Sequence, residues 1–387
     1  MAKNFILLIA SCLFCLFISE LVLRIYNPFE LRLRGNQIEL PRNKTYIFEQ
    51  NVSKRVKKTI IHTKNSLGFR GSNPPNKFDE HLTIIAVGGS TTECLFLTDN
   101  TDWPYILGKL LASHFNKIWI NNTGLDGHST YGHLVLLKSY IGKIKPKIAI
   151  FLIGMNDVNL NSKNDYDIEA AVEEKDAYIF KRVKCFVKNS YLLSLCGNLI
   201  LGIRSNMKSI GHRNIDMLSA NVNDYFIEKN KININAHNIM IDEDLSREIL
   251  NAYINQNYFN YIKRLESIVK YCKQKGIRPI FITQPLLFGE GIDPETGINL
   301  ETFYFDGGLN GKLRWKVLEL YNDATRRVGR EQGIIVVDLA NKMPKSLAYF
   351  YDEAHYTEEG SILVADIIAK DLIPKLKILY NQYNKAN

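Results

Sequence analysis

The chain has 387 residues, of which 46% are hydrophobic and 23% are charged. This composition excludes a largely disordered chain, and the length is enough for one large domain or two modest ones. The net charge is +9, but the lysines and arginines are spread along the chain without a zinc-finger or RNA-binding motif, so we expect a solvated basic surface and no nucleic-acid partner.

An apolar segment near the N-terminus has the length of a membrane-spanning helix. Residues 5–23 are FILLIASCLFCLFISELVL, interrupted only by Glu20, and about 20 such residues cross a bilayer as a helix. No small-x-small cleavage site follows, so we predict an uncleaved anchor over residues 1–24 rather than a signal peptide. Arg24, Arg32 and Arg34 favour a cytoplasmic body, but long domains often translocate regardless of charge.

Residues 25–80 are predicted to form a linker and lead-in region, because Gly68, Gly71 and the Pro74-Pro75 pair interrupt regular structure. Beyond it, apolar runs that barely alternate in polarity are typical of strands covered on both faces. These predicted strands lie at residues 83–87, 118–120, 148–153, 279–283 and 334–337.

Helical patterns separate the predicted strands. They lie at residues 103–115, where Asp102 is a candidate N-cap, at 133–144, 245–274 and 313–331, and after Thr357. Strands that alternate with helices predict an α/β fold with a parallel sheet of about five strands and right-handed crossovers.

Residues 158–243 break this alternation and are rich in Asn, Lys and Asp. We predict an insertion here, partly helical around residues 185–203, and a candidate lid. The six cysteines show no metal-ligand spacing. Cys185 and Cys196 could form a disulfide in an extracytoplasmic domain, or they could be two unrelated reduced cysteines.

Polar residues follow the predicted strand ends. Gly88-Gly89-Ser90 follows the first strand, NNTGLDGH at residues 121–128 the second, and GMND at 154–157 the third, while Asp352 and His355 precede the last helix. Ligands of open parallel sheets bind outside the carboxyl ends of the strands. The set contains a hydroxyl nucleophile, a base with an orienting carboxylate, and donors for an oxyanion, which are the components of an acyl-transfer site.

The spacing of these residues suits that chemistry. Two glycines allow a sharp turn out of the strand, so that Ser90 begins a helix with its hydroxyl exposed. A serine needs an imidazole to accept its proton, and the imidazole needs a partner for its second nitrogen. Asp352 lies three residues before His355, so one tight turn can supply that partner. Backbone N–H groups and the Asn156 amide can hold an oxyanion without adding a competing charge.

The motifs GGST, N-x-G-x-x-G, G-M-N-D and D-x-x-H, in this order, resemble those of the SGNH (GDSL-type) hydrolase family. The resemblance implies a flavodoxin-like three-layer α/β/α sandwich over residues 81–380 that hydrolyses or transfers acyl esters without a metal or organic cofactor. By position, Ser90 would be the nucleophile, His355 the base and Asp352 its orienting carboxylate. Ser90, Gly127 and Asn156 would form the oxyanion hole.

Two positions depart from the family pattern. Gly89 stands where the family usually has the aspartate of Gly-Asp-Ser, and His128 follows Gly127 where some relatives have Asp. The anchor, the N-x-x-G-F-R-G segment at residues 65–71 and Gln284-Pro285 are similar to membrane-anchored bacterial members that act on envelope polysaccharides or lipids. We therefore predict a membrane-anchored serine esterase with an extracytoplasmic catalytic domain and an ester-bearing glycan or lipid as substrate.

Three other functions stay open. One is an O-acetyltransferase that uses the same triad, and another is a catalytically silent, membrane-anchored binding or assembly protein. The third is a phosphate-binding protein that uses residues 88–91 at a helix N-terminus. The segment at residues 88–91 lacks the lysine of a P-loop, and phosphate binding would leave Asp352 and His355 without a role. The sequence leaves the oligomeric state open.

Overall fold

The protein divides into two compact units in the computed structural model, Met1–Pro41 with Glu169–Met217 and Arg42–Ile168 with Leu218–Asn387. The described residues are 2–25, 33–34, 37–38, 40–50, 53–158, 190–193, 195–196, 243–305 and 309–385. Cys185 and nearly all of the predicted insertion at residues 158–243 lie outside the described residues.

The first unit contains helix α1 (Ala2–Ile25) and the short antiparallel pair β1 (Leu33–Arg34) and β2 (Gln37–Ile38). The stretch Lys3–Ile25 has a mean hydropathy of 2.7 and is long and apolar enough to cross a membrane. A signal sequence near the N-terminus can meet the same criteria of length and composition as a membrane anchor. Glu20, the one acidic residue of the apolar run, accepts hydrogen bonds from the Tyr191 and Leu192 N–H groups at 3.0 and 2.9 Å.

The second unit is built on a parallel sheet of five strands, which confirms the predicted fold class. The sheet order is β11-β8-β7-β5-β6, with bounds Ile335–Val337, Arg278–Thr283, Ile148–Ile153, Leu82–Gly88 and Ile118–Asn122. Every residue of β5 and β7 is buried, as expected for strands covered on both faces. In their pairing Val87 lies opposite Phe151, so the two strands reach their carboxyl ends at one edge.

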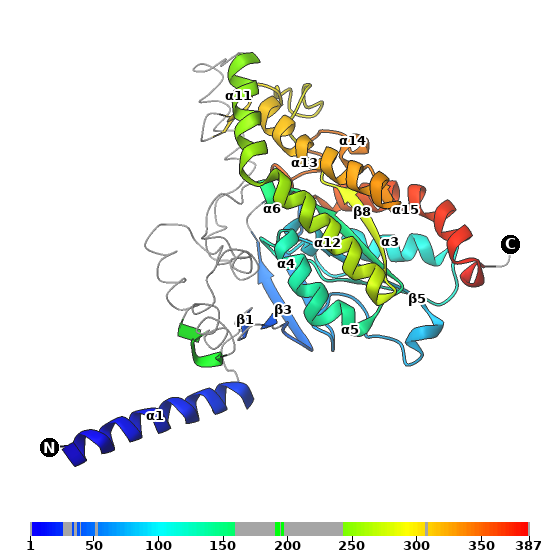
Figure 1. The fold of residues 1–387 in the computed structure, drawn as a ribbon. Helices are drawn as coiled ribbons and strands as arrows, with labels where there is room; N and C mark the ends of the chain where they lie inside the picture. The colour runs from blue at the N-terminus through cyan, green and yellow to red at the C-terminus, as the bar shows by residue number, and fades with distance from the viewer. Residues whose placement is uncertain are drawn as a thin grey trace. The chain divides into compact units, whose positions relative to one another are not determined.

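Helices cover both faces of the sheet, which gives the three-layer arrangement (Figure 1). One layer holds α3 (Trp103–Ala112) and α15 (Glu358–Leu379), which pack together. The other holds α4 (Thr130–Leu136), α12 (Phe259–Lys275) and α13 (Gly311–Gln332), with α12 between the other two in Figure 1.

The remaining elements are short connections, apart from α11. Helix α11 (Glu243–Tyr253) continues through a π-helical turn at Ile254–Tyr258 into α12, so the predicted helix over residues 245–274 is interrupted once. The others are the 3₁₀ turns Phe78–Glu80 and Asn381–Tyr383, the π-helical turn Leu137–Ile141, and α2 (Ser90–Glu93), α5 (Gly142–Ile144), α6 (Met155–Val158), α14 (Leu339–Lys342), β9 (Tyr304–Phe305) and β10 (Leu309–Asn310).

The lead-in region contains an antiparallel hairpin, β3 (Lys44–Glu49) with β4 (Thr59–Lys64), followed by the segment that ends at Gly71. Asn65 organises this segment, since its side-chain oxygen accepts from the N–H groups of Leu67 and Phe69 at 2.9 and 3.1 Å. Arg70 then pairs in the backbone with Asn122 at the end of β6. Residues 65–71 are therefore attached to the carboxyl edge of the sheet.

The two predicted helix N-caps behave differently. Thr357 caps α15, because its hydroxyl accepts from the Gly360 N–H at 3.0 Å. Asp102 occupies the N-cap position of α3, but its side chain makes no capping hydrogen bond. Its carboxylate instead accepts from the Asn122 amide at 2.9 Å and lies 3.8 Å from Arg70 Nε, because buried cationic and amide donors need an acceptor there.

Candidate active site

The turn after β5 places Ser90 at the first position of the one-turn helix α2. Gly89 is the N-cap, in an extended conformation, and Ser90 is partly exposed while Thr91 and Thr92 behind it are buried. The hydroxyl of Ser90 therefore stands at the carboxyl edge of the sheet, as the two glycines predicted.

The Ser90 carbonyl of helix α2 accepts from the Cys94 N–H at 2.9 Å, but the later carbonyl groups have no following helical turn to donate to them. Three side chains supply the missing donors. Trp103 Nε1 donates to the Thr91 carbonyl at 3.1 Å and Asn122 Nδ2 to the Thr92 carbonyl at 2.6 Å. Arg70 Nη1 donates to the carbonyls of Glu93 and Cys94 at 3.1 and 2.9 Å. The backbone that carries Ser90 is thus held by hydrogen bonds from three other segments of the chain.

The G-F-R-G motif is visible in the sequence, but this contact of Arg70 was not predicted from it. Arg70 is only 3% exposed and also donates from Nε to the Asp99 carboxylate at 3.2 Å. In the sequence, Arg70 is one arginine in a segment rich in turn-forming residues. Nothing in that segment identifies a hydrogen-bond partner more than 20 residues away.

Asp352 and His355 lie on one tight loop before α15. The Asp352 side chain accepts from the backbone N–H groups of Ala354 and His355 at 2.9 and 2.8 Å, and Tyr351 N–H donates to the His355 carbonyl at 3.0 Å. The first two bonds form an Asx-type turn, which brings the imidazole of His355 back to the carboxylate of Asp352.

His355 joins the two ends of the site. Its Nδ1 lies 2.7 Å from Asp352 Oδ2, and its Nε2 lies 2.7 Å from Ser90 Oγ. An ionised carboxylate only accepts, so Nδ1 carries the proton and Nε2 accepts from the Ser90 hydroxyl. Burial alone would raise the pKa of Asp352, but the charge and hydrogen bond of His355 and the two backbone N–H groups lower it to about 2.

Gly127 lies on a loop that packs against α2. Leu125 N–H donates to the Gly88 carbonyl at 3.1 Å, and Asp126 N–H donates to the Glu93 carboxylate at 2.6 Å. A Cβ on Gly124 would lie 2.1 Å from Glu93 N, so only glycine allows this approach. Gly127 itself follows Asp126 directly and has a φ of 71°.

Asn156 is held between this loop and the Ser90 turn. Its Nδ2 donates one hydrogen bond, to the His128 carbonyl at 2.9 Å, which leaves the second N–H of the amide without an acceptor among the described residues. A Cβ on Gly89 would lie 2.3 Å from Asn156 Nδ2 and 3.1 Å from the His128 carbonyl. This contact gives a physical reason for glycine at the position where the resembling family usually has aspartate.

A buried ion pair joins the segments that follow Gly127 and Asn156 in the chain. Arg264 of α12 donates from Nε to Thr130 Oγ1 at 2.6 Å and from Nη2 to Asp157 Oδ1 at 2.9 Å, and Asp157 accepts from the Thr130 N–H at 3.2 Å. Arg264 and Asp157 are 5% and 1% exposed. The network connects the loops after β6 and β7. Its one sequence signal was an arginine on the apolar face of α12, beside Tyr261 and Leu265.

Cys94 and the metal-ligating residue types offer no competing site. Cys94 is buried one turn after Ser90, and burial raises the pKa of its thiol, so it stays a protonated packing residue. Within the described ranges there is no group of three or more His, Cys, Asp or Glu side chains that could hold a metal ion.

Comparisons with known proteins identify one family. Residues 86–361, more than half of the chain, match the model of the GDSL-like Lipase/Acylhydrolase family. No curated protein matches the sequence. An acetylxylan esterase from Geobacillus stearothermophilus aligns at 14% identity over 76% of this chain and 93% of its own, with a TM-score of 0.38. A lipase/acylhydrolase from Enterococcus faecalis aligns at 12% identity over 76% and 96%, with a TM-score of 0.39.

Asp352→Asn should lower the free energy of unfolding by an amount that depends on pH. The pKa of Asp352 is about 2 in the folded protein and 3.8 ordinarily, so its ionised form stabilises the fold above the ordinary value. That contribution, roughly 2 kcal/mol, is lost as the pH falls through the folded pKa. In urea unfolding, the gap in free energy between the wild type and Asp352→Asn should narrow from about pH 5 to about pH 3.

Asp366→Asn is the matched control, because Asp366 pairs with Lys370 on the surface of α15 and an exposed pair contributes little. Its gap from the wild type should be small at both pH values. A gap for Asp352→Asn that stays constant between the two pH values would contradict a stabilising, ionised Asp352.

Proposed function

The chain belongs to the GDSL-like lipase/acylhydrolase family, and we propose that it is a serine ester hydrolase in which Ser90 is the nucleophile. The observation that carries the proposal is the hydrogen-bonded series Ser90–His355–Asp352, with both heavy-atom distances at 2.7 Å. Such a series supplies a base for the hydroxyl and a partner for the base.

The acylation step begins at the Ser90 hydroxyl. His355 Nε2 accepts the hydroxyl proton as Oγ attacks the ester carbonyl carbon, and the carbonyl π electrons move to the oxygen. The imidazolium that forms is stabilised by the Asp352 carboxylate. When the tetrahedral intermediate collapses, the carbon–oxygen bond to the alcohol breaks, and His355 returns the proton to the leaving alkoxide. The product is an acyl ester of Ser90 and a free alcohol.

Deacylation repeats these steps with water. His355 Nε2 removes a proton from a water molecule whose oxygen attacks the acyl carbon, and the same proton then passes to Ser90 Oγ as the acid is released. A transferase would differ only in that a sugar hydroxyl replaces water.

We assign the oxyanion hole to the backbone N–H groups of Ser90 and Gly127 and to the side-chain amide of Asn156. The free N–H of Asn156 and its position beside Gly89 support this assignment. These donors are held before reaction by the contacts to α2 and by the Arg264–Asp157 pair, so they need little reorganisation as the negative charge develops.

The site of action is proposed to be the cell envelope. Helix α1 could hold the enzyme at a membrane, and we propose an uncleaved anchor with the catalytic domain outside the cytoplasm. The substrate is then an ester-bearing glycan or lipid of that compartment.

Ser90→Ala should abolish ester cleavage and labelling by a fluorophosphonate probe, because only an activated serine attacks the probe. Thermal unfolding should change little, since Ser90 is partly exposed. The measurements are turnover of p-nitrophenyl acetate and covalent labelling detected by mass spectrometry. A phosphate-binding or catalytically silent protein would not label even as the wild type.

Ser113→Ala is the matched control, because Ser113 is exposed at the end of α3 and its hydroxyl donates to the Leu110 carbonyl of the preceding turn. It should keep both activities. More than about a tenth of wild-type turnover in Ser90→Ala would exclude Ser90 as the nucleophile.

Asn156→Ala should act on the transition state. The amide is proposed to bind the oxyanion more strongly than the ground-state carbonyl, and loss of one such donor costs on the order of a hundred- to a thousandfold in kcat. KM should stay within a few-fold, and the pH profile should keep its shape because the base is untouched. A shifted pH profile in this variant would contradict the role of Asn156.

Asp352→Asn should change the pH profile as well as the rate. The amide can present the wrong partner to His355 Nδ1 and favour the wrong tautomer. Loss of the carboxylate charge also lowers the pKa of the imidazole, so the limb of kcat/KM that reports the base should move to lower pH. Profiles from about pH 5 to 9 test this, and an unchanged rate and profile would show that Asp352 does not orient the base.

The full-length protein should sediment with membranes and resist carbonate extraction, because residues 3–25 are proposed to span the bilayer. A version lacking residues 1–29 should be soluble. A reporter enzyme that is active only outside the cytoplasm should be active when it is fused to the C-terminus of the full-length protein. Recovery of the full-length gene product as a soluble protein with a shortened N-terminus would identify a signal sequence instead.

A further inference from the structure

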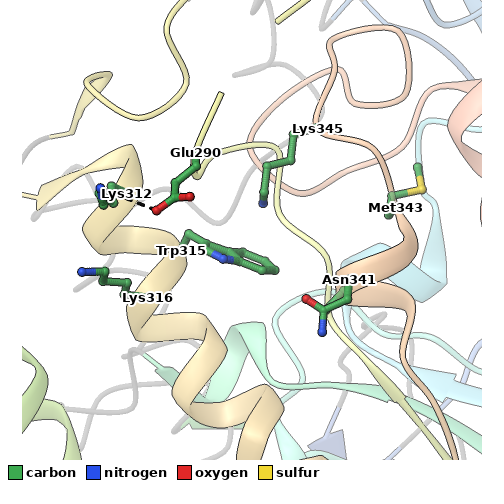
Figure 2. A pocket seen from close by; sticks show the side chains of 8 residues that line it. Glu290, Lys312, Trp315, Lys316, Asn341, Met343 and Lys345 are labelled. Carbon is green, nitrogen blue, oxygen red and sulfur yellow. Dashed lines mark ion pairs between the residues drawn. The ribbon is translucent and has the colours of Figure 1, made fainter. Parts of the chain in front are cut away.

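A cavity of about 430 Å³ lies among the start of α13, helix α14 and the loop after β8 (Figure 2). This volume is within the range of small-ligand sites. Its apolar walls include Trp315 and Met343, and its polar lining includes Glu290, Lys312 and Lys345. In Figure 2 Trp315 lies at the centre, with Lys345 and Asn341 near its ring and the Lys312–Glu290 ion pair on the other side.

Lys345 is a cation for which no carboxylate within hydrogen-bonding reach is found in the described part of the chain. Its ammonium donates to the carbonyls of Leu286 and Phe288 at 3.0 and 2.6 Å and lies 3.4 Å from the centre of the Trp315 ring. These contacts engage the ammonium through two carbonyl dipoles and one aromatic face, and none of the three brings a negative charge to it. Burial lowers the pKa of Lys345 to about 8. A partly buried cation held only by dipoles and a ring is a site for an anion.

The rest of the lining keeps the excess of positive charge. Lys312 is neutralised by Glu301 at 2.7 Å and approaches Glu290 at 3.5 Å. Lys316 is exposed on the same helix, and no ion pair of this residue is found among the residues that the structure describes. With Lys312 paired, Lys316 and Lys345 are the lining cations for which the described residues show no ion pair, and they favour a ligand that carries negative charge.

The cavity lies at the same sheet edge as Ser90. Its loops follow the carboxyl ends of β8 and β11, and α13 runs back toward the start of β11 from that edge. Two contacts join it to the loop of Asp352 and His355. Arg314, the neighbour of Trp315, donates to the Glu353 carboxylate at 2.7 Å, and Leu287 N–H donates to the Glu353 carbonyl at 2.8 Å. A polymeric substrate bound at Ser90 could therefore extend into this cavity.

The lining chemistry limits the class of ligand. A long acyl chain needs an apolar tunnel, but charged and amide side chains occupy most of this cavity. An aromatic ring supplies a flat apolar surface of the kind that packs against the C–H face of a pyranose, while Lys345 and Asn341 supply donors for oxygen atoms. The combination fits a sugar that carries a carboxylate.

We propose that the cavity around Trp315 and Lys345 is a subsite for an acidic sugar residue of the glycan whose ester is cleaved at Ser90. The cleavage of this glycan at Ser90 rests on the proposed function, whereas binding of the acidic sugar in the cavity does not. It makes the substrate an anionic polysaccharide and the Trp315 region a specificity determinant.

Binding is tested first, without catalysis. Trigalacturonate and the neutral xylotriose are titrated into full-length Ser90→Ala protein while tryptophan fluorescence is followed. Trp103 and Trp119 are buried, so a change reports on Trp315. Trigalacturonate should bind at least about tenfold more tightly than xylotriose, and less tightly at high ionic strength. Equal binding of the two sugars, or no binding of either, would overturn the proposal.

The variants are Trp315→Ala, and Lys316→Glu because its exposed position leaves folding intact. In each, combined with Ser90→Ala, trigalacturonate binding should weaken by about tenfold when it is measured by isothermal titration calorimetry, which does not need the Trp315 signal. With Ser90 intact, the ratio of kcat/KM for acetylated oligogalacturonide over acetylated xylooligosaccharide should fall by a similar factor. Lys143→Glu makes the same charge reversal on exposed α5, at the opposite edge of the sheet, and should change neither quantity. Unchanged binding and ratio in both variants would also overturn the subsite.

The two hypotheses fail separately. If the wild type binds trigalacturonate but does not cleave p-nitrophenyl acetate, the esterase proposal fails and the binding site stands. If the wild type cleaves the nitrophenyl ester through Ser90 but does not prefer the acidic oligosaccharide in binding or in cleavage, the subsite fails and the esterase stands.

Discussion

The carbonyl groups of a helix one turn long set the constraint on which the candidate site depends. No following helical turn donates to its last carbonyl groups, so the side chains of Trp103, Asn122 and Arg70 donate to them from three other segments. Each of these side chains is itself buried. The position of Ser90 is therefore decided by α3, the end of β6 and the lead-in segment together, and a change in any of them reaches the hydroxyl through the backbone of α2.

The parallel sheet brings the remaining parts to the same edge. Loops after β5, β6 and β7 carry Ser90, Gly127 and Asn156, and the loop before α15 carries Asp352 and His355. The Arg264–Asp157 pair joins two of these loops to α12. A buried pair of this kind often gives little net stability, but separating the two side chains would leave buried charges without partners, so the loops are held together.

The sequence predicted the elements whose signals are local. The five strands were identified from short apolar runs, and the Asp352–His355 contact follows from a three-residue spacing within one turn. The contacts of Arg70 and Arg264 were not predicted, because their partners lie 23 and 107 residues away and no periodicity encodes such pairs. Asp102 shows the same limit, since its cap position was predicted correctly while its side chain serves Asn122 and Arg70.

The close approach of Asn156 to Gly89 also bears on how this site can evolve. A side chain at position 89 would require the Asn156 amide to move from its present position, since a Cβ would lie 2.3 Å from the amide nitrogen. The tolerance of position 89 to substitution therefore depends on how far the loop after β7 can shift.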